Sequence, residues 1–259
     1  HGQGLVAGVA RMNGHPLLEA REVTVRFGGL VAVDRVSAAF APGELVGIIG
    51  PNGAGKTTFF NALSGVQAAT SGELFVDGQR LTGAAPHRYA LQGIARTFQT
   101  PRVFAELSVA ANIDFGLMFA GRQRKGSWLL KDEASILNLI GLAEQAAWPA
   151  AAITPSQQRL LEIGMALATR PRLLLLDEVA AGLTEAEVEA MAQLIRRLRD
   201  DLDLTVIWIE HAVTTLLRHV ERVLVLHQGR KIADGLPSEV VRNAEVIEAY
   251  LGDEMVEAV

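Results

Sequence analysis

One glycine-rich segment restricts the possible folds of this chain more than any other feature. Residues 50–57 read GPNGAGKT and match the pattern G-x-x-x-x-G-K-[ST]. The glycines allow successive backbone N–H groups to curl around a phosphate, and a following helix directs its positive end toward it. Lys56 is expected to reach the β- and γ-phosphates, and the Thr57 hydroxyl to bind Mg²⁺. The residues of this P-loop predicted to contact a nucleotide are Gly50, Asn52, Gly53, Ala54, Gly55, Lys56, Thr57 and Thr58.

The flanking sequence supplies the context that such a loop requires. Pro42-Gly43 predicts a turn, Glu44–Ile49 a buried strand and Lys56–Leu63 a helix that starts directly after the loop. The competing interpretation is a glycine-rich turn before an ordinary helix. The strand–loop–helix order favours the phosphate-binding interpretation.

Composition excludes several other classes of protein. The 259 residues allow one large domain or two small ones, and 49% hydrophobic residues predict a packed core. A net charge of −5 disfavours a nucleic-acid-binding protein, and the absence of cysteine excludes a disulfide framework or a thiol nucleophile. No apolar run approaches the roughly 18 residues that span a bilayer, so any membrane role is expected to be peripheral.

The first residues of the chain are predicted to lie outside the globular domain. Residues 1–15 lack the charged-then-apolar pattern of a secretory signal and are interpreted as a leader or linker. Met12 is a candidate natural start, and fusion to an upstream domain would give the same pattern.

Strand-like and helix-like stretches alternate along the rest of the chain. Leu17–Phe40 contains two alternating stretches around Gly28-Gly29, which predict antiparallel strands, and Ser71–Leu81 predicts a hairpin that turns at Asp77-Gly78. Residues 86–148 are predicted to be helical. Later strands alternate with helices, as in a parallel α/β sheet; the strands are Leu173–Leu176, Thr205–Ile209 and Arg222–Leu226, and the helices are Glu185–Arg199 and Thr214–His219.

An acidic pair follows the predicted strand Leu173–Leu176. The carboxyl end of such a strand is where α/β sheets place ligands. Asp177 suits Mg²⁺ binding through the water shell, and Glu178 suits a general base that polarises the attacking water. An acidic pair in this position is otherwise a common helix cap. Its place about 120 residues after the P-loop favours the catalytic interpretation.

Taken together, these segments resemble the ATP-binding subunits of ABC transporters over nearly all of residues 17–252. The resemblance implies that Gln99 contacts Mg²⁺ and the attacking water, and that His211 lies against the γ-phosphate. A lone histidine after a strand is more often structural, but the order of the motifs favours catalysis. The motifs are GPNGAGKTT at 50–58, RTFQ (the Q-loop) at 96–99, AGLT (the D-loop) at 181–184 and IEH at 209–211.

The resemblance also implies a fold and an adenine contact. It implies an α/β P-loop NTPase (RecA-like) core with an antiparallel β subdomain and an inserted α-helical subdomain. Phe27 falls where the family keeps an aromatic residue that stacks on adenine, although core packing is an alternative. The expected single domain, residues 16–259, has its core at 16–98 and about 165–240, its helical subdomain at about 99–164 and a tail at 241–259.

Closer similarity is found to the group that takes up branched-chain, or hydrophobic, amino acids. The segments FGGLVAVDRVS, GIARTFQTPRVFAELSV, LLEIGMAL and VIEAYLG carry it. It implies two transmembrane permeases, a second ABC ATPase subunit, a substrate-binding protein and a position on the cytoplasmic face of the inner membrane. Thr100–Asn112, with Val103 and Phe104, would dock against a permease.

The sequence departs from the family at its signature motif, LSGGQ, where this chain reads Ile153-Thr154-Pro155-Ser156-Gln157. The family's motif binds the γ-phosphate of the opposite subunit's ATP, and Thr154, Ser156 and Gln157 would take that role here. Pro155 has no N–H to donate. The stretch still predicts a helix start, with Thr154 as N-cap and Gln157 as its capping-box partner. We therefore expect a heterodimer in which this signature caps the weaker site.

Two further interpretations stay open at this point. The altered signature is compatible with a slow or non-hydrolysing ATP-gated regulatory module, and lipid-export ATPases share the same motifs. Val179 replaces the family's usual proline after Glu178, which predicts a less rigid loop.

Overall fold

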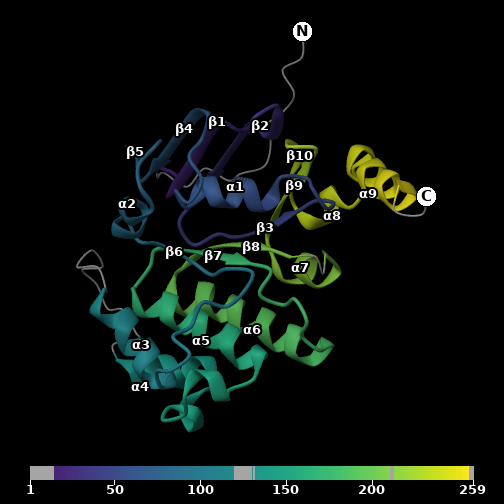
Figure 1. Cartoon of the computed structure of the whole chain (residues 1–259). Coiled ribbons are helices and arrows are strands. Elements are labelled where there is room, and N and C mark those ends of the chain that lie inside the picture. Colours follow the sequence, from purple (N-terminus) through teal and green to yellow (C-terminus); the bar gives the residue numbers. More distant parts are fainter. Residues whose placement is uncertain (1–14, 120–129, 131, 211–212, 257–259) are drawn as a thin grey trace.

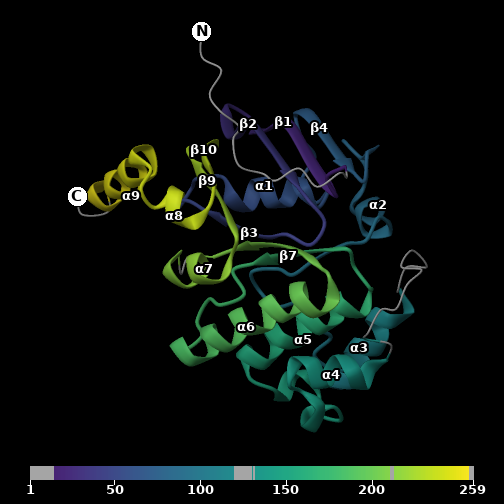
Figure 2. The ribbon, with the colours of Figure 1, turned by 180° about the vertical axis from the view of Figure 1, so that it is seen from behind.

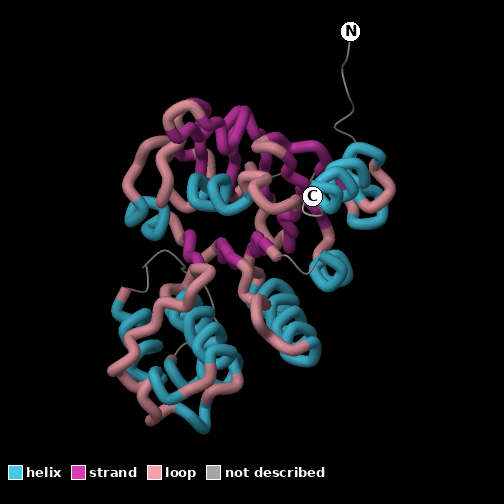
Figure 3. The backbone as a smooth tube through the Cα atoms, turned by 45° about the vertical axis from the view of Figure 1, so that its right-hand side comes forward, coloured by secondary structure: helices cyan, strands magenta, loops and turns pink. Residues whose placement is uncertain are grey.

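The computed structural model describes residues 15–119, 130, 132–210 and 213–256, and its strands form two sheets (Figure 1). A four-stranded antiparallel sheet lies above a six-stranded, mainly parallel sheet, and helix α1 (Lys56–Leu63) lies between them. Figure 3 shows the same two strand layers with this helix between them. Most other helices lie below the six-stranded sheet.

The six-stranded sheet has the order β10-β9-β3-β8-β7-β6, and only β10 runs antiparallel to its neighbour. Strands β3, β7 and β8 are buried at every residue, because apolar layers cover both faces of the sheet. The strands predicted from continuous apolar runs are confirmed. The bounds are β3 Leu45–Ile49, β6 Ile94–Arg96, β7 Leu173–Asp177, β8 Thr205–Ile209, β9 Arg222–His227 and β10 Arg230–Gly235.

The four-stranded sheet has the order β2-β1-β4-β5 and contains both predicted hairpins. Asp77 and Gly78 join β4 to β5 with φ values of 51° and 76°. Both values lie in the left-handed region that a tight two-residue hairpin requires, and Asp-Gly is a preferred pair there. The bounds are β1 Leu18–Phe27, β2 Leu30–Phe40, β4 Ser71–Val76 and β5 Gln79–Arg80.

Helix α1 (Lys56–Leu63) begins and ends where the sequence predicts and fills the space between the sheets. Phe59, Phe60 and Leu63 are fully buried and belong to one core cluster with residues of β1 and β3. Burying two phenylalanines stabilises this layer by roughly 1.5–3 kcal/mol each. The start of α1, and with it the P-loop, is therefore fixed by packing on both faces.

The other core cluster joins the lower face of the six-stranded sheet to helices α5 and α6, which Figure 2 shows from behind. Helices α3 and α4 pack onto α5 at Gly164, where an added Cβ atom would lie 2.7 Å from the side chains of Ile113 and Ile140. The remaining helices lie at the edges of the molecule. The bounds are α2 Pro86–Leu91, α3 Val109–Met118, α4 Glu133–Ile140, α5 Pro155–Ala168, α6 Glu185–Leu202, α7 Val213–His219, α8 Pro237–Val240 and α9 Ala244–Val256.

Within residues 86–148 the prediction of helix alone is wrong. Ile94–Arg96 forms the edge strand β6, which pairs with β7. Three residues are too few to show a strand periodicity, and only the neighbouring strand fixes them in the sheet. Two short 3-10 turns, at Ala143–Gln145 and Ala150–Ala152, also interrupt the helices. Among the described residues, no helix has the length and apolar composition needed to cross a membrane.

Candidate active site

The P-loop follows β3 and winds into α1. Gly53 and Gly55 have φ values of 75° and 94°, in the left-handed region that favours glycine. A Cβ atom on Gly55 would lie 2.3 Å from the Ala32 carbonyl oxygen, so no larger residue fits there. No described side chain caps α1. The first N–H groups of the helix therefore point toward the loop, where they can bind an anion.

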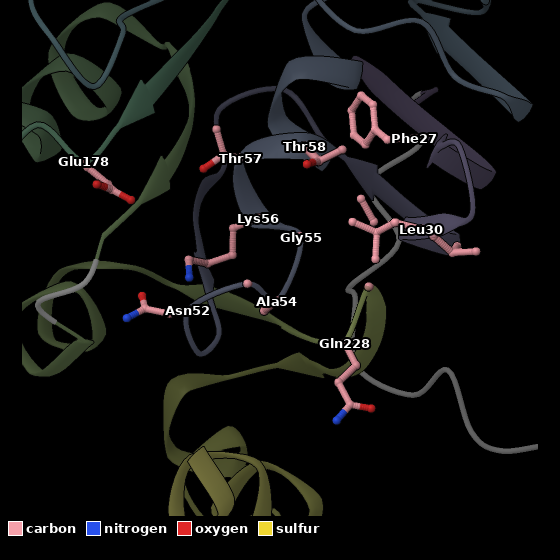
Figure 4. A pocket seen from close by; sticks show the side chains of 14 residues that line it. Phe27, Leu30, Asn52, Ala54, Gly55, Lys56, Thr57, Thr58, Glu178 and Gln228 are labelled. Carbon is pink, nitrogen blue, oxygen red and sulfur yellow. The ribbon is translucent and has the colours of Figure 1, made fainter. Parts of the chain in front are cut away.

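A pocket of about 610 Å³ opens beside the P-loop. Figure 4 shows Phe27 and Leu30 at one end of it, Glu178 at the other and Lys56 between them. An apolar end and a polar loop suit a ligand with a flat ring and a phosphate tail. The lining residues are Phe27, Leu30, Val31, Ala32, Asn52, Gly53, Ala54, Gly55, Lys56, Thr57, Thr58, Glu178, Gln228 and Gly229.

Phe27 is 49% exposed at the end of β1 and lines this pocket. The alternative of core packing is therefore wrong for this side chain. Leu30 and Gln228 complete the same end of the pocket, and sequence reasoning missed both. The turn that contains Gln228 is held by Gly229, whose N–H donates to the Ala54 carbonyl at 3.0 Å and whose carbonyl accepts from β2.

Lys56 is buried beneath the loop. Its Nζ donates to the carbonyl oxygens of Gly50 at 2.6 Å and Pro51 at 2.9 Å. Burial lowers the pKa of Lys56, and the nearby carboxylates of Glu178 and Asp177 oppose that change. The ammonium group thus holds the two carbonyls of the loop together from inside.

Gln99 and Glu178 meet at the polar end of the pocket. The Gln99 Nε2 donates to the Glu178 Oε2 at 2.7 Å, although 79 residues separate them in the sequence. Glu178 is only 5% exposed and has a φ of 50°, a conformation uncommon for a residue with a side chain. The backbone of Glu178 is held by its N–H, which donates to the Ile209 carbonyl of β8 at 2.9 Å.

Asp177 lies behind Glu178 and does not line the pocket. Its side chain is 3% exposed and lies 3.5 Å from the Arg96 guanidinium. Arg96 also donates to Asn61 Oδ1 at 2.7 Å, which anchors it to α1. Sequence reasoning missed Arg96, because its approach to Asp177 depends on the pairing of β6 with β7. The Asp177 charge is thus balanced within the core.

A second buried acid shapes the loop after Glu178. Glu210 Oε1 accepts from the Ala180 N–H at 2.7 Å and from Trp208 Nε1 at 3.1 Å. The Val179 side chain is buried beneath this loop. Sequence reasoning included Glu210 in a motif without giving it a role. The adjacent His211 lies outside the described residues.

The altered signature forms the start of α5, as the sequence predicts. Thr154 Oγ1 accepts from the Gln157 N–H at 3.2 Å, and the Gln157 side chain accepts from the Thr154 N–H at 3.0 Å. Pro155 is the first helical residue. Hydrogen bonds from the Thr184 backbone and hydroxyl, and then from the Ser156 hydroxyl, lower the pKa of Glu187 in the first turn of α6. None of these residues lines the pocket at the P-loop of the described chain.

The protein groups near the P-loop that could bind a metal ion are oxygen donors. The described residues contain no cluster of three or more His, Cys, Asp or Glu side chains able to hold a metal. Thr57 supplies a hydroxyl in the pocket, and Asp177 supplies a carboxylate behind it. This donor set fits Mg²⁺, which typically takes one or two protein oxygens and completes its shell with phosphates and water.

The sequence matches known families over most of its length. Residues 33–181 match the family described as ABC transporter, and residues 230–256 match the one described as branched-chain amino acid ATP-binding cassette transporter. The high-affinity branched-chain amino acid transport ATP-binding protein BraF of Pseudomonas aeruginosa is 37% identical, across 92% of this chain and 98% of its own. LivG of Escherichia coli K12, with the same description, is 38% identical over the same shares.

Solved structures agree with this assignment. A nucleotide-free ATP-binding cassette from an ABC transporter is 28% identical with a TM-score of 0.79, covering 91% of this chain and 98% of its own. The ADP conformation of the cassette MJ1267 is 28% identical with a TM-score of 0.80, covering 92% and 99%. The fold, the P-loop pocket and these matches lead to one conclusion: the chain belongs to the ATP-binding subunits of ABC transporters, which are ATPases.

Proposed function

We propose that this chain hydrolyses Mg-ATP to drive the uptake of branched-chain or other hydrophobic amino acids through membrane permeases. The observation that supports it most is the pocket itself, which joins an exposed aromatic ring, a P-loop and Glu178, whose carboxylate accepts from Gln99. The relatives named above carry out this transport, which supports the choice of substrate. Membrane vesicles that contain this chain, its partner ATPase and its permeases should take up leucine only when ATP is supplied. The uptake should cease when the chain carries Glu178→Gln.

The residues of the pocket divide the work of hydrolysis. Glu178 is the general base that polarises the attacking water, and Gln99 orients the same water. Lys56 and the α1 N-terminus stabilise the negative charge of the β- and γ-phosphates. Mg²⁺, when bound, would neutralise charge on these phosphates, and Thr57, Asp177 and Gln99 would hold it. His211 remains a predicted contact of the γ-phosphate.

Replacement of Phe27 tests the adenine contact. Phe27→Ala should weaken ATP binding by about 1–3 kcal/mol, the usual range for loss of an aromatic ring stacked on a base. The affinity for inorganic triphosphate, which has no base, should stay unchanged. Calorimetric titration with both ligands measures this difference. Phe75→Ala serves as a control, because it removes a half-buried ring of β4 that packs against Arg21 and does not line the pocket. Equal ATP affinity in Phe27→Ala and the parent chain would contradict stacking.

An exposed apolar surface supports permease docking. Phe104, Phe115 and Phe119 form a chain of ring contacts, with centroids 4.6 and 5.1 Å apart. Each of these rings is at least 39% exposed. A contiguous apolar patch on a solvent-exposed surface commonly marks a protein contact. Phe104 lies within the Thr100–Asn112 region predicted to dock, which would place the chain peripherally on the cytoplasmic face of the membrane.

The altered signature supports a heterodimer with a second ABC ATPase. In this arrangement the P-loop of this chain faces the partner's signature, and residues 154–157 face the partner's ATP. Pro155 lacks the N–H that would bind phosphate, and Ser156 places a side chain where the family has glycine. The partner's site would then be the weaker of the two.

Restoring the signature tests this asymmetry. In a heterodimer that carries Glu178→Gln, only the partner's site can hydrolyse ATP. Adding Pro155→Gly and Ser156→Gly should raise that remaining rate on the order of tenfold, because one or two charge-assisted hydrogen bonds to phosphate are regained. Steady-state phosphate release measures the rate. Brisk hydrolysis by the unaltered chain as a homodimer would contradict the asymmetric arrangement.

The same signature favours one alternative function, an ATP-gated regulatory module that hydrolyses slowly or not at all. This alternative predicts ATP binding without phosphate release in every mixture with the partner and the permeases. A related ATPase of lipid export would instead respond to its own permeases in the same assay.

A further inference from the structure

Helix α5 makes two buried contacts with the segment that carries Gln99. The Glu162 Oε1 accepts from the backbone N–H of Phe98 at 3.3 Å and of Arg102 at 3.0 Å. These two donors lie on either side of Gln99 in the sequence. Glu162 is 6% exposed, so solvent does not replace these bonds easily. One carboxylate therefore closes the residues 98–102 into a loop that is fixed to α5.

A second side chain of α5 joins this loop to the catalytic acid. Arg159 lies three residues before Glu162, on the same face of the helix. Its Nη1 donates to the Gln99 carbonyl at 3.2 Å and to the Glu178 carbonyl at 3.1 Å. A single guanidinium nitrogen thus connects the main chains of the two residues whose side chains meet at 2.7 Å.

The electrostatic setting of Glu162 is costly for a purely structural residue. Burial raises the pKa of Glu162 to about 7, against the lowering effects of its two N–H bonds and of Arg159 and Arg102. A buried acid stabilises a fold less than an apolar residue of similar size would. Its immediate neighbours on α5, Leu161 and Ile163, are fully buried apolar residues. Perturbed, buried acids of this kind are concentrated at functional sites.

We propose that Arg159 and Glu162 are positioning residues of the ATPase reaction, which hold the Gln99 loop so that its amide stays on the Glu178 carboxylate. The inference rests on the proposed hydrolysis at this site. Neither residue touches the pocket, so neither is expected to bind nucleotide. Because both lie on the helix that starts at the signature, a displacement of α5 would move Gln99 and the Glu178 main chain together.

Paired variants at Glu162 test the proposal. Glu162→Gln keeps an acceptor oxygen for both N–H groups, whereas Glu162→Leu removes it. We expect Glu162→Leu to lower kcat at least tenfold with KM for ATP within about twofold, because the lost interaction acts on orientation and not on binding. Glu162→Gln should restore kcat to within about threefold of the parent chain. Arg159→Met should lower kcat as Glu162→Leu does, while Arg197→Met, an exposed arginine of α6, should not.

Amide hydrogen exchange separates this proposal from the function on which it rests. Phe98 and Arg102 amides should be protected in the parent chain and in Glu162→Gln, and should exchange at least tenfold faster in Glu162→Leu. Equal exchange or equal kcat in Glu162→Leu and the parent would overturn the positioning role. So would an equal loss in Glu162→Gln. An inactive parent chain with the expected exchange pattern would overturn the proposed hydrolysis alone.

Discussion

Replacing Glu178 with glutamine is expected to reduce ATP hydrolysis by about 10²–10⁴-fold, the usual contribution of a general base. Glutamine keeps the size and the acceptor oxygen of the side chain but cannot take a proton from water. The φ of 50° at this residue and its N–H bond to Ile209 belong to the backbone and should persist. ATP binding should therefore survive, and the variant should hold ATP without releasing phosphate.

Two measurements on the same preparation test this expectation. Steady-state phosphate release, with the partner and permeases present, gives the rate, and equilibrium titration gives the ATP affinity. Glu248→Gln removes an exposed carboxylate on α9 and serves as a matched control that should retain full activity. Both the parent and the variant are measured with the partner's site inactivated, so that only the site of this chain contributes. If Glu178→Gln then kept more than about a tenth of the parent rate, another group would have to act as the base.

The strands and the P-loop helix were predictable because local sequence determines them. The strands at 173–177 and 205–209 contain the continuous apolar runs Leu173–Leu176 and Val206–Ile209, which suit strands covered on both faces. The helix after the P-loop could be predicted from the loop motif alone, because a helix follows directly after such a loop. Asp77-Gly78 likewise defines its hairpin, because both residues adopt positive φ readily.

The two edge strands of the six-stranded sheet could not be predicted in this way. Ile94–Arg96 is only three residues long, and Arg230–Gly235 is polar and partly exposed. Their neighbours in the sheet, not their own composition, determine their conformation. Tertiary context commonly overrides intrinsic preference at such positions.

The contacts that organise the site also lay beyond sequence reasoning. Arg96 was visible only as part of a motif, yet it pairs with Asp177, which is 81 residues later in the chain. Arg159 and Glu162 directly follow the signature motif, and nothing in their sequence positions indicates what they contact. Their contacts to the Gln99 loop depend on how α5 lies against β6 and β7. One sequence cannot supply that geometry, whereas the type and order of the residues proposed for catalysis were already present in it.

Replacing Lys56 with methionine should lower the affinity for ATP by about 10- to 150-fold, which corresponds to the roughly 1.5–3 kcal/mol of a hydrogen bond to a charged group. Methionine fills the same buried space but has no charge for the β- and γ-phosphates. The carbonyl oxygens of Gly50 and Pro51 also lose their donor, so the loop itself should become less ordered. Hydrolysis should fall further than affinity, because transition-state charge is no longer stabilised.

Ligands of different length make the Lys56 experiment specific. Calorimetric titration should show reduced affinity for ATP and ADP but nearly unchanged affinity for AMP, which has no β- or γ-phosphate. Lys231→Met, which removes an ammonium group paired with Asp234 on β10, should leave all three affinities unchanged. A uniform loss for ATP, ADP and AMP would instead mean that Lys56 maintains the shape of the P-loop and makes no direct contact with the terminal phosphates. That outcome would shift the charge stabilisation to the α1 N-terminus, whose N–H groups would then have to carry it alone.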